Sequence, residues 1–276
     1  MAKLQAKLYR AAVYAGAAFS VGVLVLIVGY ILVMGIPHLS PELFAWEYNS
    51  TNVSMMPAII NTLLMTLLSL LVCVPLGIGA AIWLTEYAPR GSRLVKLVRM
   101  TAETLSGIPS IIYGLFGALF FVVALKMKLS LLSGALTLSI MVLPTIMRTT
   151  EEALLAVPDS YREGSFGLGA GRLRTTFKVV LPSAVPGILS GVILAIGRIV
   201  GETAALIYTA GTVAKVPGSL LDSTRTLAVH MYTISTEGLY IDQSYATAVV
   251  LLVMVLLINS LSALIAKRVG QSPAGR

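Results

Sequence analysis

Long apolar runs recur along nearly the whole chain, and they restrict the folds open to it more than any other feature. A helix needs about 20 residues to cross the hydrocarbon core of a membrane, and about six runs approach that length. We place these spans roughly at 12–34, 57–84, 105–125, 129–147, 184–210 and 245–266. Since 57% of the residues are apolar, little sequence remains for a soluble domain. The pattern predicts an all-α, polytopic membrane helical bundle.

Domain organisation follows from the same runs. We expect a single transmembrane domain over residues 12–266, with short tails at 1–11 and 267–276. The first run is longer than the 7–15 residues of a signal-peptide core, so it is interpreted as a retained span. It follows three basic residues of the N-terminal tail, Lys3, Lys7 and Arg10.

Basic residues are distributed unevenly between the loops. With six spans, one side of the membrane receives 15 of the 20 lysines and arginines, and the other side receives four. Because lysine and arginine are retained on the cytoplasmic side during insertion, we expect both termini to be cytoplasmic. This asymmetry also accounts for the net charge of +8, so the charge does not indicate a nucleic-acid partner.

Signals for a soluble enzyme are weak or missing from the sequence. No GxxxxGK[ST] phosphate loop occurs, and the glycines at 167–171 do not follow a strand, so we expect no nucleotide or other cofactor on this chain. His38 and His230 lie far apart in loops, which disfavours a metal site. Cys73, the single cysteine, lies within an apolar run and cannot form an internal disulfide. The chain is not expected to be an enzyme.

The most informative stretch is the polar segment between the fourth and fifth spans, at about 148–182. Its letters at 163–169 are EGSFGLG, and after nine further residues the stretch VVLP occupies 179–182. This spacing closely resembles the EAA loop of binding-protein-dependent ABC importer permeases, a family of type I permease folds. Two alanines of the usual pattern are replaced by Gly164 and Ser165, which are also small, and Val179 replaces isoleucine.

The resemblance implies a role for the loop. In that family it docks on the ATPase subunit, so ATP and its magnesium ion would bind to a partner and not to this chain. A helix with small residues on one face can settle into a cleft of a partner, and a glycine lets the backbone turn sharply after it. The residues assigned to ATPase coupling on this basis are Glu163, Gly164, Ser165, Gly169, Leu181 and Pro182.

Three further stretches narrow the resemblance to one subfamily. The sequences LSGIPSIIYGLFG at 105–117, VLPTIMRTTEEA at 142–153 and GRIVGETA at 197–204 resemble the PstA-type permeases of phosphate-specific importers. The resemblance implies a bacterial inner-membrane protein that forms a heterodimer with a PstC-type permease. It also implies a PstB-type ATPase dimer and a periplasmic PstS-type binding protein as partners, and inorganic phosphate as the substrate.

Two charged residues, Arg198 and Glu202, fall within the fifth predicted span. A charge at mid-membrane costs about 2.5–3.5 kcal/mol even on insertion scales, so such residues face protein or water and find partners. Their i, i+4 spacing would place them on one helix face, where they can pair with each other. Guanidinium also binds phosphate oxygens in a bidentate manner. The pair therefore predicts either an anion relay point in the substrate pathway or a structural ion pair.

Other polar residues in the spans carry weaker signals. Asn61, Thr62, Thr66, Asn259, Ser260 and Ser262 are candidates for a pore lining, although hydrogen bonds between helices explain them as well. Gly107, Pro109 and Gly114 interrupt the third span, as helices along a transport path or packing kinks do. The long segment 211–244 is either a docking site for a binding protein or a solvated loop.

The predicted function is a permease that imports inorganic phosphate using ATP hydrolysed by a separate subunit. Three alternatives stay open on the sequence. The first is import of another oxyanion, such as sulfate or molybdate. The second is a membrane signalling scaffold that does not transport. The third, an intramembrane hydrolase, has no nucleophile and base arrangement in its favour.

Overall fold

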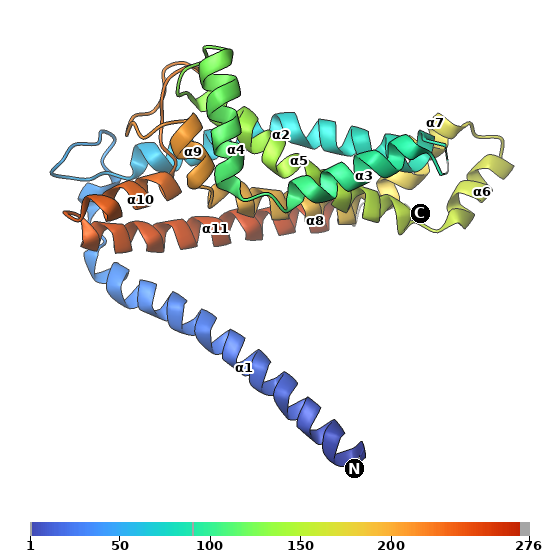
Figure 1. The fold of residues 1–276 in the computed structure, drawn as a ribbon, viewed down its shortest axis with the longest axis horizontal. Coiled ribbons are helices and arrows are strands. Elements are labelled where there is room, and N and C mark those ends of the chain that lie inside the picture. The colour runs from blue at the N-terminus through green and yellow to red at the C-terminus, as the bar shows by residue number, and fades with distance from the viewer. Residues whose placement is uncertain (1, 90, 271–276) are drawn as a thin grey trace.

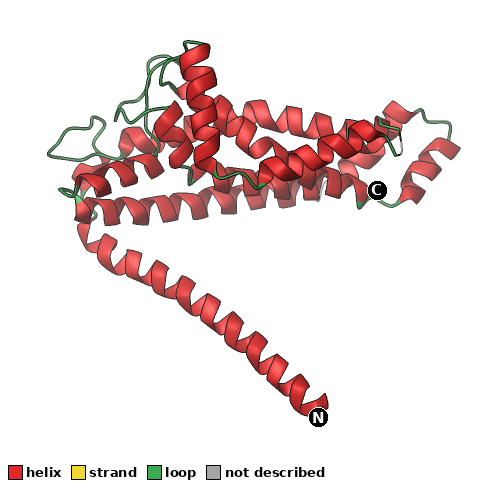
Figure 2. Cartoon of the chain, viewed as in Figure 1, coloured by secondary structure: helices red, strands yellow, loops and turns green. Residues whose placement is uncertain are grey.

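The computed structural model describes residues 2–89 and 91–270, and every regular element in this part of the chain is a helix (Figure 2). Five helices are long and apolar enough to cross a membrane, and a bent pair of helices would make a sixth span. The five are α1 (Ala2–Gly35), α2 (Met56–Ile82), α5 (Leu131–Leu155), α8 (Leu181–Val200) and α11 (Ile241–Gly270). This architecture confirms the predicted all-α membrane bundle.

Shorter helices cap the two ends of the bundle (Figure 1). One end carries α9 and α10, and the opposite end carries α6 and α7. Three π-helical segments, η3, η4 and η5, continue or precede the longer helices, and η1 and η2 are short 3-10 turns. The bounds are η1 Ile36–His38, η2 Pro41–Phe44, η3 Trp83–Tyr87, α3 Arg93–Ser106, α4 Ser110–Gly117, η4 Ala118–Ala124, α6 Asp159–Gly167, α7 Arg172–Thr175, η5 Thr176–Val180, α9 Ala204–Thr209 and α10 Leu227–Glu237.

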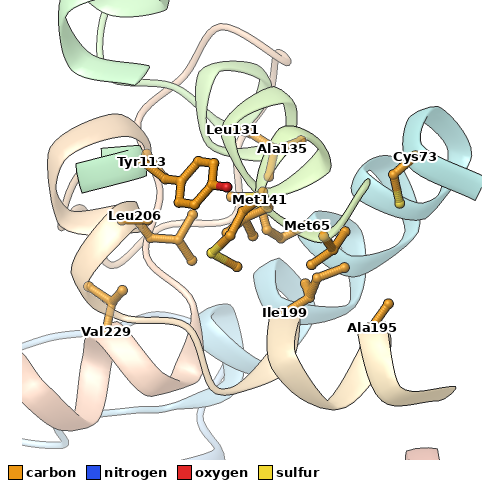
Figure 3. Close-up of a cluster of buried hydrophobic side chains, with 14 of the residues drawn as sticks. Met65, Cys73, Tyr113, Leu131, Ala135, Met141, Ala195, Ile199, Leu206 and Val229 are labelled. Carbon is orange, nitrogen blue, oxygen red and sulfur yellow. The ribbon is translucent and has the colours of Figure 1, made fainter. Parts of the chain in front are cut away.

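The centre of the bundle is α5, which packs against both α2 and α8. Figure 3 shows part of the core around it, where Met65 from α2, Met141 from α5 and Ile199 from α8 converge. The helices approach closely because small residues face each other. A Cβ atom added at Gly187 of α8 would lie only 2.6 Å from the Cβ of Ala153 on α5. This packing fixes α8 relative to α5, and both helices contribute to the site described below.

The third predicted span, 105–125, is not one continuous helix. The chain breaks at residues 107–109, and the two helices on either side, α3 and α4 with η4, meet at 103°. Proline at 109 disfavours helical backbone at the residue before it and has no N–H to donate, so the helix ends there and a new one begins. In Figure 1, α3 runs along the bundle whereas α4 projects from its side.

The fifth predicted span, 184–210, is also corrected. The helical segment begins earlier, at Arg172, and α8 ends at Val200. Gly201 is the C-cap of α8, and the short helix α9 begins only at Ala204. The prediction failed because the apolar run resumes at Ala204 after only three residues, whereas the helical backbone hydrogen bonding of α8 ends at Gly201. Consequently, Arg198 lies in the last turn of α8 and Glu202 lies beyond its end.

Helix α1 stands apart from the other spans. It is bound to α11 near its C-terminal end, where the Tyr30 and Tyr245 hydroxyls are 3.3 Å apart. From there it diverges from the bundle (Figure 1). Only 6% of its most apolar window is buried, so nearly the whole helix is left for lipid or another subunit to cover.

Candidate functional site

Arg198 lines a cavity of about 610 Å³ between α5, α8 and α11. The guanidinium has neither an ion pair nor a side-chain hydrogen bond with any residue that the structure describes. Its neighbours in the lining include Thr145 from α5, Ser190 from α8 and Asn259 from α11. The Oδ1 atom of Asn259 is buried and also lacks a partner. The cavity therefore presents one positive charge and one buried amide oxygen that the fold itself does not use, whereas the Ser190 hydroxyl donates to the backbone oxygen of Pro186.

Glu202 does not pair with Arg198, contrary to the expectation from their spacing. Its carboxylate instead accepts a hydrogen bond from the backbone N–H of Ala205, at 3.0 Å, and so caps the start of α9. The side chain is 8% exposed. The physical reason is the break at Gly201, because i, i+4 neighbours share a face only while the helix continues. Of the two predicted pathway residues, the structure places only Arg198 in the cavity.

The polar residues of the second predicted span have structural partners. Asn61 donates through Nδ2 to the backbone oxygens of Lys215 and Arg225, at 2.9 and 3.1 Å. Thr62 donates to the Ala58 oxygen and accepts from the N–H of Leu227. These contacts bind α2 to the segment that precedes α10. Asn61 and Thr62 therefore form hydrogen bonds between elements, which was one of the two alternatives, and are not placed as a pore lining.

The residues of the EAA-like loop form a protruding end of the molecule. Glu163 and Gly164 lie on α6 with exposed side-chain positions, and a Cβ atom added at Gly164 would meet nothing within 4 Å. Next to them, Leu168 is 91% exposed. Gly169 adopts φ +81°, a conformation that residues with a side chain rarely enter, and it turns the chain after α6. This arrangement leaves Glu163 and Gly164 exposed on α6, with the exposed side chain of Leu168 next to the helix end.

The remaining loop residues join α6 to α7 and form the start of α8. Ser165 and Thr175 approach through their side-chain oxygens at 2.8 Å. Leu181 is the first residue of α8, and Pro182 occupies its first turn, where a missing N–H is tolerated. The motif residues thus lie in one connected segment, α6 to the start of α8, at the end of the bundle.

An arginine that the sequence analysis missed holds this segment in place. Arg162 on α6 pairs with Glu86 in η3 at 2.7 Å, and the two side chains are only 15% and 8% exposed. The same guanidinium donates to the backbone oxygens of Leu154 and Val157 at 2.9 and 2.8 Å. The hydrogen bond to Glu86 raises the pKa of Arg162, opposed in part by burial. Arg162 therefore links α6 to both the end of α2 and the end of α5.

No sequence pattern could have paired these residues. Glu86 follows the second apolar run, and Arg162 directly precedes Glu163 of the motif. Each position draws attention to its residue but does not indicate a partner. They are 76 positions apart, however, and only the packing of α2 on α5 brings them together.

Comparison with known proteins identifies the family. Residues 73–272 match the model described as "Binding-protein-dependent transport system inner membrane component". The chain belongs to this permease family. The match includes α5, the EAA-like loop and Arg198, so it covers both sites described above.

Relatives of this permease refine the assignment. The probable ABC transporter permease protein YqgI of Bacillus subtilis is 33% identical over 88% of each chain. The phosphate transport system permease protein PstA 2 of Mycobacterium tuberculosis is 38% identical over 75% of this chain and 70% of its own. The phosphate transport system permease protein PstC of Mesorhizobium japonicum is 31% identical over 79% of this chain and 75% of its own. Several PstA-named relatives make this a PstA-type permease.

Solved structures agree with the fold of the permease. A chain of a bacterial alginate ABC transporter, in complex with a periplasmic protein, matches 97% of this permease and 98% of its own length with a TM-score of 0.67 at 16% identity. A chain of the MetNI methionine ABC transporter matches 78% of this permease and 95% of its own length with a TM-score of 0.63 at 23% identity. At these identities the likeness concerns the fold, which is that of a type I ABC importer permease.

Proposed function

We propose that this permease imports inorganic phosphate as one half of a heterodimeric pore. The observation that carries the proposal is the unpartnered guanidinium of Arg198 in a cavity between three spans. A cation without a counter-ion is costly inside a membrane, and a phosphate anion in the cavity would supply the missing charge. Guanidinium offers two parallel N–H groups that match two phosphate oxygens. PstA-named relatives support the same substrate.

The assembly that this function requires has three further kinds of subunit, one of them present as a dimer. A PstC-type permease would complete the pore, and a PstS-type periplasmic protein would deliver phosphate to it. A PstB-type ATPase dimer would bind ATP and magnesium on the cytoplasmic side. The excess of basic residues in the loops next to α6 supports a cytoplasmic location for this end and for both termini.

The route from the ATPase to the cavity follows contacts already described. The exposed face of α6, with Glu163 and Gly164, would dock on the ATPase. Movement of α6 would reach α2 and α5 through Arg162, since that side chain binds Glu86, the carbonyl group of Leu154 in α5 and that of Val157 just beyond it. Helix α5 also lines the cavity at Thr145. In this account Glu202 supports the geometry by capping α9 and does not exchange with phosphate for the guanidinium.

Uptake of radiolabelled phosphate by proteoliposomes tests this function. The vesicles contain the two permeases, the ATPase and the binding protein, with ATP enclosed on the ATPase side. We expect ATP-dependent phosphate accumulation that excess sulfate or molybdate does not compete away. Competition by sulfate or molybdate would instead assign the permease to another oxyanion, and ATP hydrolysis without accumulation would favour the signalling scaffold.

A further inference from the structure

A second arginine without a counter-ion lies at the opposite end of the bundle from α6. Arg225 directly precedes α10, and its side chain is 4% exposed. No carboxylate of the described residues forms an ion pair with it. Among the described residues it makes a cation–π contact with the ring of Tyr48, whose centroid lies 4.6 Å from the guanidinium carbon. An aromatic face offsets only part of the cost of burying a cation.

Unpartnered polar atoms concentrate around this arginine. Ten buried side-chain polar atoms of the described residues lack a hydrogen-bond partner, and six of them belong to Asn61, Arg225, Thr226 and His230. These four residues are neighbours, since Asn61 donates to the Arg225 oxygen at 3.1 Å and the N–H of His230 donates to the Thr226 oxygen at 2.8 Å. Native proteins satisfy nearly all such atoms, so a cluster of them indicates a missing occupant.

The pattern of unused donors indicates what the occupant is. The unpartnered atoms of Arg225 are Nε and Nη2, which form one edge of the guanidinium plane. That edge presents two parallel N–H groups, the arrangement that binds two oxygens of a carboxylate or phosphate. The Thr226 hydroxyl, next along the chain, is a further donor without a partner, and a ring N–H of His230 can serve as another. Burial, and then the charge of Arg225, lower the pKa of His230 to about 3, so its ring is neutral at physiological pH.

The segment that covers this cluster is itself under strain. Tyr48 contacts both basic residues, because its ring lies against the Arg225 guanidinium and also meets the His230 ring in a T-shaped arrangement at 6.0 Å. Five residues further along, Val53 is 1% exposed and adopts φ 45°, which is unusual for a β-branched residue. The guanidinium nitrogens without partners are closed to solvent, so exchange of an occupant requires this segment to move.

We propose that Arg225, Thr226 and His230 form a binding site for a small inorganic oxyanion, covered by the Tyr48 segment and separate from the Arg198 cavity. The site would hold the anion by its charge and by the edge of the Arg225 guanidinium, with Asn61 accepting a hydrogen bond from an accompanying water. The inference does not depend on phosphate being the transported substrate, because any tetrahedral oxyanion carries the required oxygens.

Thermal unfolding of the purified complex tests the site. All complexes carry Arg198→Gln, so that the Arg198 cavity does not contribute to anion binding. Within this background, complexes with Arg225 are compared with complexes that carry Arg225→Met. Each is measured in potassium gluconate, potassium phosphate and potassium sulfate. Gluconate is too large for a closed site and serves as the reference. The control substitution is Arg148→Met, which removes an arginine that is exposed and paired with Glu152.

The proposal predicts that the order of stability reverses between the buffers. In gluconate, Arg225→Met should melt several degrees above the chain with Arg225, because the uncompensated charge is gone. In phosphate, the chain with Arg225 should gain several degrees and Arg225→Met should not. Stabilisation by phosphate alone would give the site the selectivity expected of a phosphate importer, and equal stabilisation by sulfate would make it a general oxyanion site.

Equal buffer dependence with and without Arg225 would overturn the proposal. A second measurement covers the case in which the variants do not assemble. Electron cryo-microscopy maps of the wild-type complex in phosphate and in gluconate should differ by density against Nε and Nη2 of Arg225. Maps with no such difference would also contradict the site, whereas they would leave the function proposed for the Arg198 cavity untouched.

Discussion

Arg162 and Arg198 are both partly buried, but their surroundings differ completely. Arg162 has a carboxylate at 2.7 Å and two backbone carbonyls, so its donors are used within the fold. Arg198 has none of these and borders a cavity of about 610 Å³. A partnered arginine fixes helices to one another, and an unpartnered one is left for a ligand. We therefore assign Arg162 to the proposed coupling end of the permease and Arg198 to the proposed substrate pathway.

The largest effect on assembly is expected from Arg162→Gln. The substitution leaves Glu86 buried without its partner, which typically costs about 3–5 kcal/mol, and it frees α6 from α2 and α5. We expect loss of stability together with phosphate uptake that falls far more than ATP hydrolysis. Thermal unfolding, uptake and ATPase rates of the reconstituted complex measure these quantities. Glu86→Gln should have a similar effect. If phosphate uptake per ATP hydrolysed is unchanged in both variants, Arg162 does not transmit movement from the ATPase to the cavity.

A smaller effect is expected from Gly169→Val. A β-branched residue at φ +81° is strained by about 1–2 kcal/mol, and relief of that strain would reorient α6 on the ATPase. The chain should still be inserted, since a Cβ atom there meets nothing within 4 Å. We expect reduced uptake per ATP hydrolysed. Gly167→Ala is the matched control, because Gly167 is equally open but has no positive φ. Normal coupling in Gly169→Val would count against a docking role for this turn.

Substitution of Glu202 should have a modest effect. Glu202→Ala removes the side chain that caps α9, which costs about 1 kcal/mol, whereas glutamine retains an oxygen that can accept from Ala205. Glu202→Gln should therefore be close to wild type in thermal unfolding and in uptake. Because Arg198 and Glu202 do not pair, adding Glu202→Gln should not restore uptake to Arg198→Gln. Recovery of uptake in that double variant would instead support the hypothesis that Arg198 and Glu202 form a structural ion pair.

The smallest effect is expected from substitution of an arginine whose ion pair is exposed to solvent on both sides. Arg148 and Glu152 form an i, i+4 pair on α5 at 3.0 Å, with side chains 59% and 63% exposed. Such pairs contribute about 0.3–0.5 kcal/mol. Arg148→Gln should leave stability, coupling and uptake nearly unchanged in the same assays. A loss comparable to that of Arg162→Gln would show that burial does not determine the role of these arginines.

The sequence predicted the parts of this molecule that depend on local pattern. Apolar length located the helices of the bundle, and the spacing of the EAA-like loop located α6 and the turn at Gly169. Gly107 and Pro109 had marked the first break, and the structure bends there. Hydropathy did not reveal the second break, at Gly201, because apolar residues resume at Ala204 after only three positions.

The candidate sites depended on contacts that sequence spacing does not encode. Arg198 was singled out because a charge within an apolar run is conspicuous, and it borders a cavity, although its role in a substrate pathway stays a prediction. Its assumed partner was wrong because the helix ends between the two residues. The link from Arg162 to Glu86, and the cluster around Arg225, join segments that are distant along the chain, and only tertiary packing brings them together.

The most direct test of the account is phosphate uptake by proteoliposomes that contain Arg198→Gln, with Arg198→Lys measured alongside. The account predicts an assembled complex of normal stability that accumulates no phosphate with glutamine and some with lysine, which keeps the charge but not the planar pair of donors. Assembly is verified by co-purification of the ATPase and the second permease. Uptake at the wild-type rate by assembled Arg198→Gln would contradict the claim that this guanidinium binds the transported anion.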